Sequence, residues 1–309
     1  MCIRDRDRPE AGSSMMRGFI FAIVAVSVLS GPSFALPGAP SAAEGAPESR
    51  FVIGNTLWTL VHEMAHALIS ELDVALLGKE EDAADCIATI ALLHGHAEFG
   101  IPNQIEEVDF IVSTAEAWRA EWELERRHGF TATYADTHSL DIQRFYNILC
   151  LLYGSGPDKY GDLAVELGLP FERALACLEY EHEQALRAVN YLITMFGPFH
   201  NPRSPGRRIS VVYEASSDRR HDRLASLVRN ARVAELVAEH TERLFVLPED
   251  IQIVFMSCLG QETAFWREDR KEIVFCYELL ERFEYLYRAT GCLEDEGLTE
   301  KQLDECLAR

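Results

Sequence analysis

Basic residues are scarce in this chain, because 29 lysines and arginines stand against 50 aspartates and glutamates and leave a net charge of −21. A surface this negative repels the phosphates of nucleic acids and the headgroups of anionic lipids. The sequence therefore argues against a nucleic-acid partner or an anionic membrane surface, and it favours solubility and cationic ligands.

Three other features are missing. Beyond residue 35 no apolar run reaches the roughly 18 residues that a membrane-spanning helix needs. No two cysteines have CxxC spacing, which excludes a zinc knuckle of that type. No internal repeat with a period of 20 to 50 residues is present, which excludes a solenoid or propeller.

The N-terminal segment is typical of a secretory signal peptide. Arg17 gives a short basic start, an apolar run covers residues 19–29, and Ser33-Phe34-Ala35 resembles a small-residue cleavage site. We therefore predict a signal peptide over residues 15–35, cut after Ala35, and an exported protein that is periplasmic or extracellular and has no stable membrane insertion. An uncleaved N-terminal anchor is the alternative.

Two stretches flank this predicted signal peptide. Residues 1–14 precede a plausible start at Met15 or Met16 and show no structural pattern, so we interpret them as mis-called upstream sequence. Residues 36–50 are rich in proline, alanine, glycine and serine without apolar periodicity, which is typical of a flexible linker. The folded part is expected to begin near Phe51.

Apolar residues then recur every three or four positions, which predicts a series of helices. The predicted helices cover residues 53–72, 79–95, 104–127, 139–153, 159–167 and 171–194. After residue 200 the pattern changes to strands in 208–216 and 247–258, a helix over 221–245, a short strand running into a helix over 271–290, and the start of another helix in 298–309. The sequence predicts a predominantly helical α+β fold, in which residues 51–200 form a helical metal-binding catalytic part and residues 201–309 complete the same domain.

The stretch "TLVHEMAHALI" carries the chemistry. In a helix, His62 and His66 lie on one face, one turn apart, so both imidazoles can bind one ion. Neutral imidazole is a good ligand for Zn²⁺, and Glu63 is placed to take a proton from metal-bound water. This HExxH pattern also arises by chance, and the two histidines would then be ordinary core residues. The uncharged neighbours Met64 and Ala65 favour a site-bearing helix buried in a core.

A catalytic zinc site needs a third protein ligand. Glu81 and Asp85 have helical i, i+4 spacing, so one can bind zinc while the other orients a ligand histidine from the second shell. We assign Glu81 as the ligand and Asp85 as the residue that hydrogen-bonds the outer nitrogen of a ligand histidine. The alternative is that the acids at the start of this helix only offset its dipole. His94 and His96 are the rival ligands.

The combination of HExxH with Glu81-Asp82-Ala83-Ala84-Asp85 resembles the gluzincin branch of zinc peptidases. The stretches "NTLWTLVHEMAHALISELDVALLGKEEDAAD", "ADTHSLDIQRFYNILCLLYGSGP" and "RALACLEYE" more closely resemble a family of metallopeptidases called domain of unknown function 4344, over most of residues 51–290. The resemblance implies a zincin-like fold, in which an edge strand of a small sheet lies beside the active-site helix and holds the substrate as an extra strand.

The order of segments departs from that family. The stretch "LPEDIQIVFMSCLGQETAFWREDRKEIVFCYELLERF" precedes the metal helix in the family and follows it here, and the last residues, "LTEKQLDECLAR", would join naturally onto the metal helix. A circular permutation or a rearranged gene model accounts for this order. A tandem pair of half copies would need a second HExxH, which the sequence lacks.

The resemblance also suggests two disulfides among the cysteines. It pairs Cys258 with Cys276, which would link neighbouring strands, and Cys150 with Cys177, which would link consecutive helices. Spacing alone leaves many other pairings open, and the odd number of exported cysteines leaves at least one free thiol. Cys86 is expected to be a buried thiol.

These features together predict a secreted zinc-dependent peptidase that acts on peptides or proteins, with Glu63 as general base. A donor for the developing oxyanion is also expected, and His138 and Tyr146 are the candidates, with Tyr134 behind them. His138 has the simpler reading of a residue at a helix start. The strand "EIVFCYE" is a candidate for the substrate-binding edge or part of the core. The alternative function is a non-catalytic exported zinc-binding or protein-interaction protein.

Overall fold

The structure is a computed structural model, and it describes residues 46–309 except 100–106, 201–207, 296 and 309. The side chains of residues 96–99 and 107–109 are also outside the described part. The expected upstream sequence, the signal peptide and most of the expected linker therefore fall outside the described residues.

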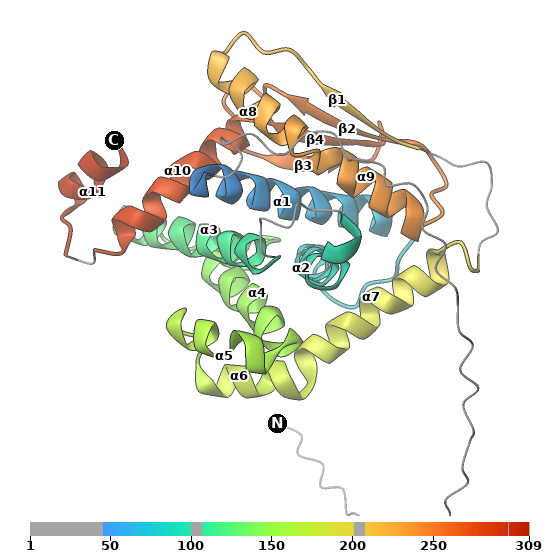
Figure 1. Ribbon diagram of the computed structural model, residues 1–309, viewed down its shortest axis with the longest axis horizontal. Coiled ribbons are helices and arrows are strands. Elements are labelled where there is room, and N and C mark those ends of the chain that lie inside the picture. The colour runs from blue at the N-terminus through green and yellow to red at the C-terminus, as the bar shows by residue number, and fades with distance from the viewer. Residues whose placement is uncertain (1–45, 100–106, 201–207, 296, 309) are drawn as a thin grey trace, which may run out of the picture. The chain divides into compact units, whose positions relative to one another are not determined.

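A long helix, α1 (Pro47–Glu71), passes through the middle of the folded part (Figure 1). From Phe51 to Ile69 it is buried on nearly every side, which explains why its sequence is apolar around most of the helix. Gly54 lies against Phe110, and a Cβ atom at this glycine would be 2.7 Å from the Phe110 ring. Glycine is therefore required for the close packing of α1 on its neighbour α3.

The other helices before residue 200 pack on one another, and α2 and α3 also pack on α1. They are α2 (Glu80–Phe99), α3 (Glu107–Arg127), α4 (Asp141–Ser155), α5 (Pro157–Glu166), α6 (Phe171–Ala176) and α7 (His182–Phe196). A single π-helical stretch (Cys177–Glu181) joins α6 to α7, so the helix predicted over 171–194 continues through a local distortion. The prediction of a helical region is confirmed, and α1 begins at Pro47, inside the stretch expected to be linker.

The sheet has four strands, β1 (Ile209–Tyr213), β2 (Ile251–Met256), β3 (Ala264–Arg267) and β4 (Glu272–Cys276). Their order is β1-β2-β4-β3, with β1, β2 and β4 parallel and β3 antiparallel to β4. The suggestion that "EIVFCYE" is a substrate-binding edge is wrong, because β4 pairs with β2 on one side and β3 on the other. The edge beside α1 is β3, and its four residues were not predicted as a strand.

The prediction of one continuous helix over residues 221–245 is also wrong. Two helices, α8 (Arg219–Asn230) and α9 (Val233–Leu244), replace it. The chain breaks at Arg232, whose φ of 56° lies in the left-handed region that an α-helix does not use. The turn lets α8 and α9 each bury an apolar face, and both pack on α1 and on the sheet or α10.

The last two helices are α10 (Tyr277–Leu293) and α11 (Glu300–Leu307). A capping box at Thr299 starts α11. α10 packs along α1, where Tyr287 contacts the ring of Phe51 with 5.6 Å between centroids. One hydrophobic core therefore joins helices from both halves of the sequence. The described part is a predominantly helical α+β structure, as predicted, and the circular permutation stays a prediction.

Three cysteine pairs form disulfides. Cys150–Cys177 and Cys258–Cys276 are the pairs that the resemblance suggested, and Cys292–Cys306 ties α10 to α11. Disulfides of this number are typical of an oxidising, exported environment. Cys86 is the free thiol among the described residues, and burial raises its pKa to about 11, which keeps it unreactive. Among the described helices none is long and apolar enough to cross a membrane.

Candidate metal centre and active-site pocket

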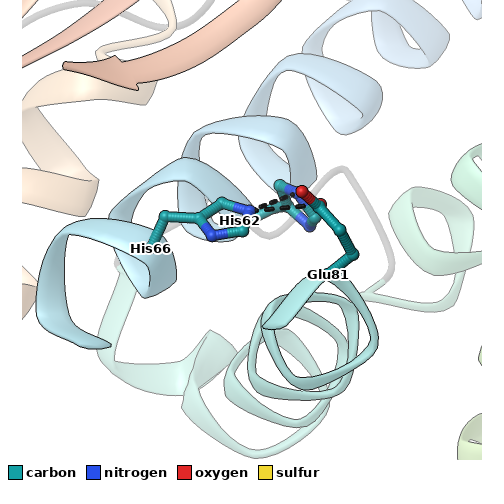
Figure 2. Close-up of side chains that lie close together, drawn as sticks. All are labelled: His62, His66 and Glu81. Carbon is teal, nitrogen blue, oxygen red and sulfur yellow. Dashed lines mark hydrogen bonds and ion pairs between the residues drawn. The ribbon is translucent and has the colours of Figure 1, made fainter. Parts of the chain in front are cut away.

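Two imidazoles from α1 and one carboxylate from the first turn of α2 converge (Figure 2). The Nε2 atoms of His62 and His66 are 3.1 Å apart, and the Glu81 Oε2 atom lies 3.4 Å from the first and 3.2 Å from the second. A tetrahedral zinc ion with ligands at 2.0–2.1 Å holds them about 3.3 Å apart. The spacing of these three atoms therefore fits a zinc ion.

The contacts of the two Nδ1 atoms, which point away from the cluster, indicate why the cluster favours a cation. His62 Nδ1 lies 2.8 Å from Asp85 Oδ1, in a contact that is short but poorly aligned, and His66 Nδ1 lies 2.8 Å from Glu80 Oε1. These carboxylates favour a proton on each Nδ1, so both Nε2 atoms present lone pairs to each other and to the anionic Glu81. Three lone pairs that meet at one point repel one another unless a metal ion or a proton joins them.

In the metal-free protein, the pKa values of these side chains also favour a positive charge at this point. Burial lowers the pKa of His66, but hydrogen bonds to Glu81 and Glu80 outweigh it and raise the pKa to about 9. The pKa of His62 is also raised, because Asp85 and Glu81 outweigh its burial. Burial opposes ionisation of Glu81, yet its hydrogen bonds with His138, His62 and His66 hold its pKa well below the usual range.

Asp85 does more than contact His62. Both of its carboxylate oxygens accept hydrogen bonds from Arg144, at 2.7 Å from Nε and 2.6 Å from Nη2. The Arg144 guanidinium is buried and lies 3.6 Å from the centre of the Trp118 indole ring. Burial raises the pKa of Asp85, but His62 and Arg144 outweigh it and lower the pKa, so Asp85 stays ionised. A chain of contacts thus runs from Trp118 through Arg144 and Asp85 to the imidazole.

Glu63 lies next to this cluster and is 7% exposed. Burial raises the pKa of its carboxyl group, and the nearby His62 and His66 partly oppose that shift. The backbone N–H of Trp266, in β3, donates a hydrogen bond to it. A buried carboxylate with a raised pKa is a suitable general base, and the edge strand fixes its position.

His138 reaches the cluster from the loop between α3 and α4. Its Nε2 lies 3.0 Å from Glu81 Oε2, and its Nδ1 lies 3.0 Å from Asp136 Oδ1. The hydrogen bond with Glu81 is the main reason that its pKa is raised. The loop is tied to α2, because Ser139 Oγ donates to Asp82 Oδ1 at 2.6 Å. His138 is therefore positioned as a cationic or hydrogen-bonding group beside the cluster.

A pocket of about 350 Å³ opens at this point, and its walls include His62, Glu63 and His138. The start of β3 contributes Ala264 to the same wall. A larger hollow of about 820 Å³ lies between α3 and residues 290–300 and includes none of these catalytic candidates. The smaller pocket is the one that joins the edge strand to the candidate metal centre.

The other predicted candidates lie elsewhere. Tyr146 packs edge-on against Phe145 and does not line the pocket, and Tyr134 is 84% exposed. His94 lies farther along α2 with its Nε2 3.0 Å from that of His182, so it does not join the cluster. The side chain of His96 falls outside the described residues.

Sequence reasoning missed Arg144, Glu80 as the partner of His66, and β3. A signal for Arg144 does exist, since it lies one helical turn before Ile148 on a face that is otherwise buried. A cation in that position requires a buried anion. The sequence does not say which of the many carboxylates supplies it.

Comparison with protein families decides the family. The model of domain of unknown function 4344, described as "Putative metallopeptidase", matches residues 39–192 and 213–308. The chain belongs to this family. No curated protein and no solved structure shows a significant match. Membership implies a metal ion, and His62, His66 and Glu81 supply a donor set that fits one.

Proposed function

We propose that this metallopeptidase-family protein is an exported, zinc-dependent peptidase with His62, His66 and Glu81 as the metal ligands. Two imidazoles and one carboxylate suit Zn²⁺, and a position left open on the ion is typical of catalytic sites. When bound, the ion supplies Lewis acidity and lowers the pKa of a coordinated water. The other steps belong to side chains of this chain.

One observation carries the proposal. The Glu63 carboxylate, buried and with a raised pKa, faces the same pocket as His62 and is next in sequence to it. In the proposed reaction Glu63 accepts a proton from the attacking water and passes it to the leaving amine. Asp85 and Arg144 hold the His62 ring and its tautomer, so that Nε2 would be the atom that binds the metal.

His138 is the proposed stabiliser of the oxyanion. It lies on the wall of the pocket, is 47% exposed at its side chain, and Asp136 orients its ring. Contacts to Glu81 and Asp136 raise its pKa, which favours the protonated form that a developing negative charge needs. Tyr146, the other candidate, does not line the pocket and packs against Phe145.

Strand β3 is the proposed binding edge for the peptide. It pairs with β4 on one side, and no described strand pairs with its other side. Its backbone contacts Glu63 through Trp266, and its first residue lines the pocket. A peptide added there as a further strand would bring its backbone past the base.

The test is a Glu63→Gln variant, with Glu305→Gln on the exposed face of α11 as the matched control. Loss of a general base lowers kcat by about 10²- to 10⁴-fold. We expect that loss, with zinc content unchanged at one ion per chain, while the control keeps full activity. Full peptide hydrolysis by Glu63→Gln would contradict the proposal. A parent protein that holds zinc, cleaves no peptide and ignores a hydroxamate inhibitor would instead be a non-catalytic zinc-binding protein.

Export is the second part of the proposal. The predicted signal peptide and the three disulfides support it. The N-terminal sequence of the protein recovered from a secreting host tests it, and we expect the mature chain to begin at Leu36. Recovery of the chain only in the cytoplasm with reduced cysteines would contradict export.

A further inference from the structure

The pocket beside Glu63 has more acidic side chains than its basic side chains neutralise. Apart from Glu63, its walls include Glu121, Glu125, Asp141 and Glu262. Two arginines, Arg144 and Arg282, also line it. The balance of charge depends on which carboxylates these arginines already hold.

Both arginines are committed to partners. Arg144 is bonded through two nitrogens to Asp85, on the metal side of the pocket. Arg282 donates from Nε and Nη2 to the two oxygens of Glu121, at 2.8 and 2.5 Å, and its Nε is 3.7 Å from Glu262. Each arginine therefore cancels about one negative charge.

Asp141 and Glu125 are left without a direct ionic partner, although Arg144 and His138 lie near enough to Asp141 to lower its pKa. Among the described residues neither carboxylate has a hydrogen bond or an ion pair. Asp141 is the first residue of α4 and is partly buried, and Glu125 lies near the end of α3. Burial raises the pKa of Asp141 to about 6, with further contributions from Glu125 and Glu121. Arg144 and His138 offset the repulsion between these acids only in part, because the net effect is a raised pKa.

Part of the remaining wall is apolar, which adds a second and independent constraint on what binds. The indole of Trp118 and the side chains of Leu279, Phe283 and Leu286 line the same pocket. Apolar walls with acids at hand suit a long side chain that has an aliphatic stem and a charged end. A metal ion would gain nothing from these apolar walls, whereas lysine and arginine match both parts.

We propose that this pocket selects peptide substrates with a lysine or arginine side chain next to the scissile bond, with Asp141 and Glu125 as the specificity-determining residues. The inference rests on the proposed peptidase function. An N-terminal ammonium group of a substrate has related chemistry, but it lacks the stem that the apolar walls would cover. The two sources are separated by blocking the peptide's N-terminus.

The experiment uses matched, N-acetylated fluorogenic peptides in which one position at a time carries either lysine or norleucine. Norleucine keeps the aliphatic stem and lacks the charge. We expect kcat/KM for lysine to exceed that for norleucine at one position by about tenfold or more, as for a charged hydrogen bond. Asp141→Asn and Glu125→Gln should each lower this lysine-to-norleucine ratio, and the double variant should bring it near one. Glu172→Gln, on exposed α6, is the control that leaves the ratio unchanged.

The outcomes separate this inference from the proposed function. Cleavage of lysine and norleucine peptides at equal rates would overturn the inference and leave the peptidase intact. Cleavage that requires a free N-terminus would overturn it too, because the bound cation would be the α-ammonium group. If the zinc-loaded protein cleaves no peptide, the proposed function fails, and calorimetric binding of the same pairs to Glu63→Gln decides the inference. Equal affinities would then refute it, and tighter lysine binding would support a cation-selective pocket without catalysis.

Discussion

Histidine and acidic side chains gather in two comparable places in the described residues. One is the cluster of His62, His66 and Glu81, and the other consists of Asp218, His221 and Glu281, near the ends of the parallel strands. Both sets have the composition of a metal site. They differ in where the protons and the positive charges already are.

The second cluster contains its own cation. Arg220 lies 3.2 Å from Asp218 and 3.3 Å from Glu281, and His221 Nδ1 is 3.0 Å from the hydroxyls of both Ser216 and Ser257. Arg220 therefore forms ion pairs with both acids, the hydroxyls contact His221 Nδ1, and His221 Nε2 lies 3.5 Å from Glu281 Oε1. At the first cluster both imidazoles turn their Nε2 atoms toward the same anion, and no arginine or lysine pairs with Glu81 in the described part of the chain. The two clusters contain similar residue types. What distinguishes the candidate metal centre is that no guanidinium or ammonium group already pairs with its carboxylate ligand.

The largest expected difference between the two clusters is in their contribution to zinc affinity. Glu81→Ala removes an anionic ligand, so we expect zinc affinity to fall by more than about 100-fold, beyond the effect of an outer partner. The matched change, Glu281→Ala in the second cluster, should leave affinity unchanged. Competition with a chelating dye measures both. Equal losses in the two variants would show that the two clusters do not differ in kind.

A second effect concerns stability. Arg144→Met leaves the buried Asp85 carboxylate without its cation, and breaking a buried pair in this way costs about 3 to 5 kcal/mol of unfolding free energy. Arg220→Met, at the exposed arginine of the second cluster, should shift the urea midpoint only slightly. Unfolding in urea with the metal removed measures both variants. Similar small shifts would mean that Arg144 is not needed to neutralise Asp85.

A third, smaller effect is the coupling of metal binding to pH. The pKa of His66 is about 9 without metal, against 6.5 ordinarily, so at pH 7 it carries a proton that a metal must displace. Zinc binding should therefore release at least one proton at pH 7, and zinc affinity should rise with pH until about 9. The sign for folding is the reverse: the proton on His66 stabilises the metal-free fold below about 6.5, and this stabilisation is lost as pH rises through 9.

Calorimetry in buffers with different ionisation enthalpies counts the released protons. Glu80→Gln removes one of the hydrogen bonds that raise the pKa of His66, so this variant should release fewer protons at pH 7 than the parent. An unchanged proton count in Glu80→Gln would show that Glu80 does not control the protonation of His66.

Much of the fold follows from local pattern. The helices before residue 200 are long and periodic, and their predicted and observed limits agree within a few residues except where α1 starts early. Strand β3 was not predicted from the sequence, because it has only four residues among charged neighbours and depends on pairing with β4. The apolar run of β4 was read as a possible edge, although a strand buried on both faces belongs inside a sheet. The break at Arg232 depends on how α8 and α9 pack, which local pattern does not specify.

The site divides in the same way. His62, His66, Glu81 and Asp85 come together because helical spacing fixes each pair within its own helix, and only the approach of α1 to α2 had to be inferred. His138 reaches the cluster from a loop whose direction is set by contacts such as that of Ser139 with Asp82. Tyr146 lies in α4, where it packs against Phe145. Arg144 required knowledge of which buried anion it meets. Long-range pairings of this kind are the part that sequence spacing does not specify.

The most direct test of the account is a crystal structure of the zinc-loaded protein with anomalous diffraction measured at the zinc edge. We predict one strong peak between His62, His66 and Glu81, and none beside His221. A peak at Asp218, His221 and Glu281, or no peak at the three predicted ligands in a folded, zinc-saturated crystal, would contradict the central claim.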